Sequence, residues 1–275
     1  MKAVHILSTL PSGEGFRPAF FEVAAMSLSA ILWKKYNGEI LLYTDDRFYE
    51  YIKNNGLVNL WDRIDHSLFQ SLPTTIDWSI FWAGAKLFAL RNEKAPVVML
   101  DTDLFIWQDI RELYQNYQLI TLHREDLIDC YLPKNELTVA DGYAYPEGLD
   151  WSIRPCNTAF AYFAGNEFKD LYVREAIRFM KGNTLKTNDG NARMVFAEQR
   201  LLAMLACREG VDIETIIGDP FSADNRVFTH LWGAKVLARS NPIQRHRLEK
   251  AILMKIEAIS PSVYDKLLEL RHELT

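Results

Sequence analysis

The stretch PVVMLDTDLFIW, residues 96–107, places two aspartates inside an otherwise apolar run. Residues 97–100 are aliphatic, as is typical of a buried β-strand, and residues 104–106 could continue that strand. Carboxylates are seldom buried unless they are paired or bind a metal. Asp101 and Asp103 therefore need a structural or a chemical reason to interrupt this run.

The surrounding sequence alternates between strand-like and helix-like patterns. We expect strands within residues 3–9, 39–45 and 61–67, and helices at residues 20–32, 46–56 and 77–92. Asp77 is the expected N-cap of the last of these helices. Such alternation favours an α/β fold with a mainly parallel sheet and helices on its faces. Ligands of these sheets bind beyond the carboxyl ends of the strands, which is where the two aspartates lie.

The second half of the chain is less regular. We expect strands within residues 119–126 and 157–165, and helices at 167–182, 191–210 and 241–274, the last broken around Pro261. Residues 130–152 are rich in turn formers and aromatic residues, which predicts a long functional loop. We expect one domain over residues 1–275, with a nucleotide-binding half (1–110), an acceptor- or sugar-binding half (111–240) and a C-terminal helical extension (241–275).

Composition excludes several classes of protein. A net charge of −5 and a pI near 5.7 argue against a nucleic-acid binder, which would usually carry a basic stripe. The three cysteines form no CxxC pair, so neither a disulfide framework nor a thiolate zinc site is indicated. The N-terminus lacks a signal-peptide pattern, and no apolar run is long enough for a membrane span. A cytoplasmic protein is the expectation.

Two aspartates one residue apart at a strand end can face a single cation. Mg²⁺ and Mn²⁺ are hard cations that prefer oxygen ligands. If the ligand is a nucleoside diphosphate, such an ion stabilises the negative charge that develops on the leaving group. The alternative is structural: one aspartate caps a turn and the other is exposed to solvent.

Four motifs, taken in order, strengthen the metal interpretation. They are WAGAKLFALRNEKAPVVMLDTDLFIW (82–107), PCNTAFAYF (155–163), VFAEQRLLAML (195–205) and THLWGAK (229–235). This order resembles the GT-A glycosyltransferases, especially the retaining family 8 type, with its Asp-x-Asp strand end, Asn-x-Gly strand, Asp-Gln helix start and late His-x-x-Gly segment. The resemblance runs from about residue 3 to residue 239. It departs at Ala159, where the family has glycine, at Glu198, where it has aspartate, and at Lys235, which stands one residue early.

The resemblance implies a set of site residues. Asp101, Asp103 and His230 would be the metal ligands for Mn²⁺ or Mg²⁺. Catalytic or sugar-positioning roles fall to three residues in the later motifs: Asn157, Glu198 and Gln199. The donor phosphates or sugar would be held by Lys86, Thr102 and Lys235. Each has a structural alternative, such as a satisfied core histidine for His230 or a solvated helix face for Lys86.

The loop after the first strand, residues 10–18, is the expected place for a nucleoside, because a helix N-terminus follows it. Thr9, Arg17 and residues 44–46, with Asp46 among them, are the donor-site candidates. An inverting-type general base also stays open, since the unassigned loop contains Asp129, Glu136 and Asp141.

The resemblance implies a metal-dependent, retaining transferase that moves a sugar from a nucleotide donor, with UDP-sugars favoured, to a hydroxyl acceptor. The acceptor would be a glycan or a lipid-linked glycan in surface polysaccharide biosynthesis, and a peripheral membrane contact stays open. One alternative is a sugar-nucleotide nucleotidyltransferase, which GEGFRP (13–18) partly echoes. The other is a non-catalytic nucleotide- or sugar-binding scaffold on the same fold.

Overall fold

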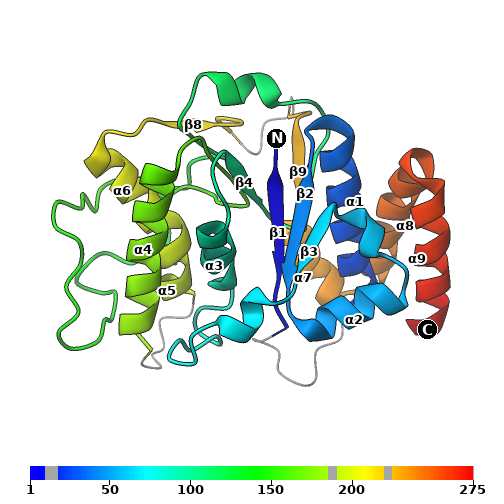
Figure 1. Ribbon diagram of the computed structural model, residues 1–275, viewed down its shortest axis with the longest axis horizontal. Helices are drawn as coiled ribbons and strands as arrows, with labels where there is room; N and C mark the ends of the chain where they lie inside the picture. Colours follow the sequence, from blue (N-terminus) through cyan, green and yellow to red (C-terminus); the bar gives the residue numbers. More distant parts are fainter. Residues whose placement is uncertain (10–17, 185–190, 220–224, 275) are drawn as a thin grey trace.

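The structure is a computed structural model that describes residues 1–9, 18–184, 191–219 and 225–274 (Figure 1). A central sheet has seven strands in the order β3-β2-β1-β4-β7-β6-β8, and two further strands, β5 and β9, pair separately. The strands are β1 (Ala3–Leu7), β2 (Ile40–Thr44), β3 (Arg63–Asp65), β4 (Val97–Leu100), β5 (Leu104–Ile106), β6 (Leu119–Thr121), β7 (Phe160–Phe163), β8 (Ile213–Thr215) and β9 (Phe228–His230).

The sheet is mixed and mainly parallel. Strands β3, β2, β1 and β4 run parallel to one another, as does β8 with β6, whereas β7 runs antiparallel to both of its neighbours. The predicted fold class, an α/β protein with a mainly parallel central sheet and flanking helices, is confirmed.

Helices cover both faces of this sheet (Figure 1). They are α1 (Phe20–Tyr36), α2 (Asp46–Asn54), α3 (Ala85–Asn92), α4 (Asn166–Gly182), α5 (Ala192–Val195), α6 (Leu201–Glu209), α7 (Trp232–Ser240), α8 (Pro242–Ile259) and α9 (Pro261–Leu274). Short 3₁₀ turns lie at Val58–Leu60, Leu68–Ser71 and Arg111–Gln115, and a π-helical turn spans Phe196–Arg200.

Successive residues of β4 divide between the two hydrophobic layers. Val98 and Leu100 pack with α1, α8 and α9, whereas Val97 and Met99 pack with α3, α4 and α6. This two-residue period is the geometry of an extended strand, and it explains why β4 is apolar throughout. The strand is therefore held from both sides, which fixes the position of the residues that follow it.

Two expectations for the region around β4 are wrong. The helix expected at residues 77–92 begins only at Ala85, because Asp77 accepts hydrogen bonds from the backbone N–H and hydroxyl of Ser79 and so forms a local turn. Residues 104–106 do not continue β4. They form β5, which leaves the central sheet and pairs antiparallel with β9.

The C-terminal helices belong to the core. The expected break at Pro261 is present, since α8 ends at Ile259 and α9 begins at Pro261. Side chains of both helices are buried against α1: Ile252, Leu253, Ile256, Leu267 and Leu270. Among the residues that the structure describes, none of the helices is long and apolar enough to cross a membrane.

Candidate metal centre

A turn between β4 and β5 positions the two aspartates. The backbone N–H of Asp101 donates to Ala159 O across 2.7 Å, and the Leu104 N–H donates to Asp101 O across 3.1 Å. The second bond closes a tight turn at the point where the chain leaves the central sheet. Asp101 and Asp103 are therefore two residues of one rigid turn at the carboxyl end of β4.

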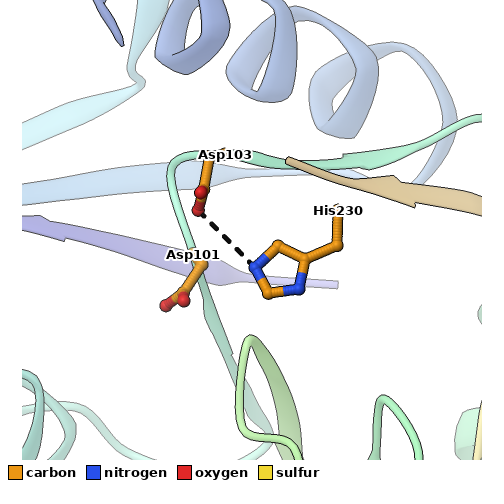
Figure 2. A group of neighbouring side chains, drawn as sticks. All are labelled: Asp101, Asp103 and His230. Atoms are coloured by element: carbon orange, nitrogen blue, oxygen red, sulfur yellow. Dashed lines mark ion pairs between the residues drawn. The ribbon is translucent and has the colours of Figure 1, made fainter. Parts of the chain in front are cut away.

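The small β5–β9 sheet brings His230 to the same place from far along the chain. Leu104 lies opposite His230 in this pairing, and the Leu231 N–H donates to Asp103 O across 3.1 Å. One ligand atom each from Asp101, Asp103 and His230 lie within 4.8 Å of one another. Figure 2 shows the His230 ring turned toward Asp103, with 3.8 Å between His230 Nε2 and Asp103 Oδ1.

Burial sets the protonation states of these groups. It lowers the pKa of His230, against the pull of Asp103 and Asp101, so the imidazole is neutral near pH 7 and has a free lone pair for a metal. Burial also acts to raise the pKa of Asp103, but the positive charges near it, Lys235 first, outweigh burial and hold that pKa below the usual value. Asp103 is thus an ionised carboxylate.

Two lysines neutralise the carboxylates. Lys235 Nζ lies 2.6 Å from Asp103 Oδ2. Lys86 Nζ forms ion pairs with both Asp101 and Glu198, at 2.8 Å from Glu198 Oε1. Burial opposes the charge on Lys86, but the two carboxylates outweigh it and raise the pKa of the ammonium group. Three acids and two lysines therefore form one connected group of charges.

A pocket of about 330 Å³ opens beside this group. Asp101, Thr102, Asp103, Lys86 and Lys235 line one side of it, and α1 and the end of β1 line the other. The lining also includes half-exposed Trp82, as well as Arg239, whose Nη2 lies 2.6 Å from Glu22 Oε1. Cations, carboxylates and an aromatic face thus meet in one hollow of the surface.

The π-helical turn carries Glu198 and Gln199. Single π turns widen a helix locally and often occur at functional sites. Glu198 is buried and reaches Lys86, and burial raises the pKa of its carboxyl against the attraction of that lysine. Gln199 instead accepts a hydrogen bond from Tyr131 Oη. It is not among the residues that line the pocket.

The backbone segment that contains Asn157 contacts the Asp101 turn. Its side chain donates to Glu125 Oε1 across 2.7 Å and accepts from the Ala159 N–H across 3.1 Å. Because Ala159 O also accepts from Asp101, the segment before β7 and the Asp101 turn are in direct contact. Asn157 itself does not line the pocket.

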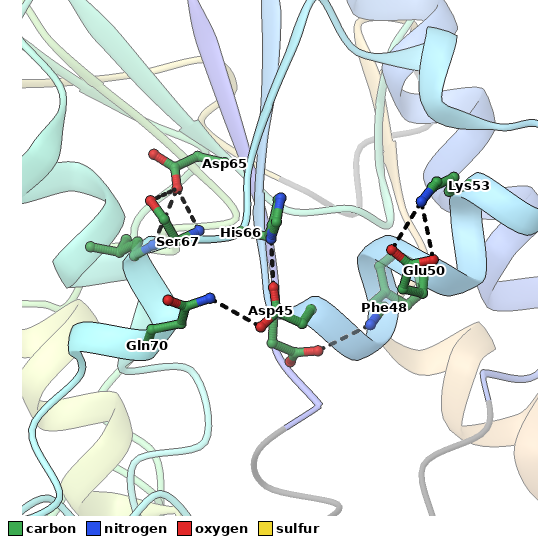
Figure 3. Close-up of polar contacts among 10 residues, drawn as sticks. Asp45, Phe48, Glu50, Lys53, Asp65, His66, Ser67 and Gln70 are labelled. Carbon is green, nitrogen blue, oxygen red and sulfur yellow. Dashed lines mark hydrogen bonds and ion pairs between the residues drawn. The ribbon is translucent and has the colours of Figure 1, made fainter.

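The structure places the donor-site candidates at the ends of β1 and β2 in different surroundings. The Thr9 N–H donates to Asp45 Oδ2 across 2.6 Å, and Asp45 caps α2 by accepting from the Phe48 N–H (Figure 3). Asp46 is exposed and contacts the side chains of His66 and Gln70. It is thus not brought to the pocket. Arg17 lies outside the described residues.

Sequence reasoning missed several residues of the pocket, among them Arg239 and Trp82. Arg239 stands four residues after Lys235, so both lie on one face of α7, and that spacing could have identified it. Trp82 lies three residues before α3, in a segment that was expected to be helical, and carries no sequence signal of its own.

The donor set fits a hard divalent cation. Two carboxylates and a neutral imidazole are ligands that Mn²⁺ accepts, and Mg²⁺ takes the same oxygens. The buried Oδ1 of Asp101 is held by the Lys86 ammonium group. A cation bound to Asp101 would replace or share that partner.

Comparison with known proteins identifies a family. The chain belongs to a family of unknown function (DUF6734), whose model matches residues 7–270. Comparison with curated protein sequences gives no match.

Several solved structures share part of the chain path. Mouse xyloside xylosyltransferase 1 in its apo form is 12% identical over 78% of this chain and 85% of its own, with a TM-score of 0.42. The PaToxG glycosyltransferase is 11% identical over 98% and 86%, also at 0.42. Galactosyltransferase LgtC, in complex with donor and acceptor sugar analogues, is 13% identical over 73% and 71%, at 0.38. At these identities the likeness concerns the fold alone.

Proposed function

We propose that this member of the DUF6734 family is a glycosyltransferase that binds a nucleotide-diphosphate sugar through a divalent cation. The convergence of Asp101, Asp103 and His230 beside a pocket lined by basic side chains carries this proposal. A cation, Mn²⁺ or Mg²⁺, would be held by these three residues and would supply Lewis-acid stabilisation of the diphosphate oxygens.

The lysines make the site responsive to a diphosphate. In the structure Lys86 and Lys235 neutralise Asp101 and Asp103, the groups that would face the cation. Once a cation takes over that role, the two ammonium groups can turn toward phosphate oxygens, for which lysine is a common partner. Arg239, on the same face of α7 as Lys235, offers a planar group that binds phosphate in a bidentate manner.

The reacting sugar would lie beside this charge group, on the side where Glu198 and the π-helical turn contact it. Glu198 is positioned by Lys86, and its backbone carbonyl accepts from Tyr172 Oη across 2.7 Å, which fixes the turn. Gln199 has a carboxamide, a poor nucleophile, so we assign it to positioning rather than to covalent chemistry. Asn157 would contact the sugar or the acceptor. Retention of configuration and the UDP-sugar donor are further parts of this proposal.

Nucleotide-sugar turnover tests the proposed function. We expect Mn²⁺-dependent release of nucleoside diphosphate from at least one UDP- or GDP-sugar, with a rate at least about tenfold lower for His230→Ala, because a lost ligand weakens the metal. The matched control is His246→Ala, since His246 is exposed on α8.

The alternatives give other products. Release of pyrophosphate from a nucleoside triphosphate and a sugar phosphate would assign a nucleotidyltransferase instead. Metal-dependent nucleotide binding without turnover of any tested sugar nucleotide would leave a binding scaffold.

A further inference from the structure

Helix α7 and the first turn of α8 expose four large apolar side chains. Trp232 is 70% exposed, Val236 61%, Leu237 57% and Ile243 66%. Trp232 and Val236 stand one turn apart on α7, whose only buried side chain is Ala238, and Ile243 follows at the start of α8. Large apolar groups this exposed along one short stretch of chain are typical of an interaction surface.

The charge of this segment differs from that of the whole chain. Residues 225–248 contain no Asp or Glu, and their basic residues are Arg226, Lys235, Arg239, Arg245 and Arg247, whereas the chain has a net charge of −5. Arg226 and Arg247 are exposed, and Arg247 stands one turn after Ile243 on α8. Apolar and basic side chains therefore occur together on one segment of an acidic protein, where Lys235 and Arg239 form ion pairs with Asp103 and Glu22 and Arg226 and Arg247 are exposed.

Local hydrogen bonds hold this surface in shape. Arg245 Nε donates to Ala238 O across 2.9 Å and Arg245 Nη2 donates to Arg239 O across 3.0 Å, so a cation caps the carboxyl end of α7. Asn241 begins α8 by accepting from the Ile243 N–H across 2.9 Å. The two helices thus present their exposed side chains without needing to fold on contact.

We infer that this segment docks the protein on an anionic lipid bilayer. A helix with tryptophan and aliphatic residues beside arginines and without acids suits the interface of such a bilayer, where apolar groups enter the acyl boundary and cations meet lipid phosphates. Lys235 and Arg239 stand three and seven residues after Trp232, so they lie on the same face of α7 as Trp232 and Val236. They also line the pocket, so docking through this face holds the pocket beside the lipid surface.

Vesicle co-sedimentation of the full chain tests this inference. We expect binding to vesicles of phosphatidylcholine mixed with phosphatidylglycerol, weak binding to phosphatidylcholine alone, and weaker binding at raised salt. The double variant Trp232→Ser/Ile243→Ser should have an affinity for the anionic vesicles that is about tenfold lower or more, since it lacks apolar groups that enter the bilayer. Arg226→Gln/Arg247→Gln should lower it by about tenfold at low salt and by less at high salt.

The matched control is Ile128→Ser, because Ile128 is 55% exposed in the loop that follows β6. It should bind vesicles as the unaltered chain does. The inference is overturned if the chain stays in the supernatant, if both vesicle types bind it equally, or if Ile128→Ser loses binding to the same extent. Self-association that Trp232→Ser/Ile243→Ser abolishes, without vesicle binding, would assign the surface to a second copy of the chain instead.

Discussion

Lys86 pairs with two acids, the buried Glu198 and the partly exposed Asp101. Replacing it with methionine keeps most of the length of the side chain but leaves Asp101 and Glu198 without their shared counter-ion. We expect Lys86→Met to lower the free energy of unfolding by about 3 kcal/mol at pH 7, since an uncompensated buried charge is costly. Chemical denaturation measures this loss, and adding Glu198→Gln to the variant should restore part of it.

A surface ion pair provides the control for Lys86. Lys34 Nζ lies 2.9 Å from Asp62 Oδ1, and both side chains are more than a third exposed. Lys34→Met should therefore change the free energy of unfolding by less than about 1 kcal/mol. If the two variants lose the same amount, Lys86 has no special role in the charge group.

Strand β1 and helix α1 are linked by a buried histidine. His5 Nδ1 accepts from Trp61 Nε1, and His5 Nε2 lies 3.1 Å from Ser29 Oγ on α1. Burial lowers the pKa of His5 from 6.5 to about 3, against the pull of Asp103. Below pH 6.5 the unfolded chain therefore binds a proton on this histidine, whereas the folded chain does not bind it until about pH 3. The free energy of unfolding thus decreases as the pH is lowered from 6.5 to 3.

We expect His5 alone to reduce the free energy of unfolding by about 2 kcal/mol between pH 7 and pH 5. Comparing denaturation at the two pH values for the unaltered chain and for His5→Gln measures its share, because glutamine does not titrate. His246→Gln, on the exposed side of α8, is the control and should keep the full pH dependence. An equal pH dependence in the His5→Gln variant would contradict this assignment.

Some helix and strand boundaries are set by tertiary contacts rather than by the local sequence pattern. The apolar run 104–106 predicts strand correctly but not its partner, because β5 pairs with β9, more than a hundred residues later. Residues 191–210 have a helical pattern throughout, yet the π-helical turn inside them depends on contacts such as Tyr172 Oη to Glu198 O. Local propensity carries no information about the β5–β9 pairing or about the Tyr172–Glu198 contact.

The C-terminal helices stabilise the whole molecule rather than forming a separate appendage. Leu267 of α9 is fully buried in the layer that also contains α1 and β4. We expect Leu267→Ala to lower the free energy of unfolding by about 3 kcal/mol, with unfolding still in one transition. Leu237→Ala, at an exposed position, should change it by less than about 0.5 kcal/mol. A separate early transition in the Leu267→Ala variant would show that α9 unfolds independently.

At the scale of the molecule, the fold class and six of the residues that meet at the site follow from sequence: Asp101, Asp103, His230, Lys86, Thr102 and Lys235. Asp101 and Asp103 were identifiable because acids interrupt an apolar run of sequence, and His230 because its motif followed in order. Arg239 and Trp82 were missed because their place in the pocket depends on how α7 and the segment before α3 pack across the sheet end. Asp46 was chosen where Asp45, the N-cap, makes the contact with Thr9.

The central claim is that Asp101, Asp103 and His230 hold a divalent cation that in turn holds a nucleoside diphosphate. Calorimetric titration of UDP and GDP, with and without Mn²⁺, tests it most directly in the unaltered chain, in Asp103→Asn and in Asp109→Asn. Asp109 is the control because it is an exposed aspartate six residues further along the same segment. We expect Mn²⁺-dependent binding that Asp103→Asn abolishes and Asp109→Asn retains. Binding of UDP or GDP that does not depend on Mn²⁺, or that is retained in Asp103→Asn, would contradict the claim.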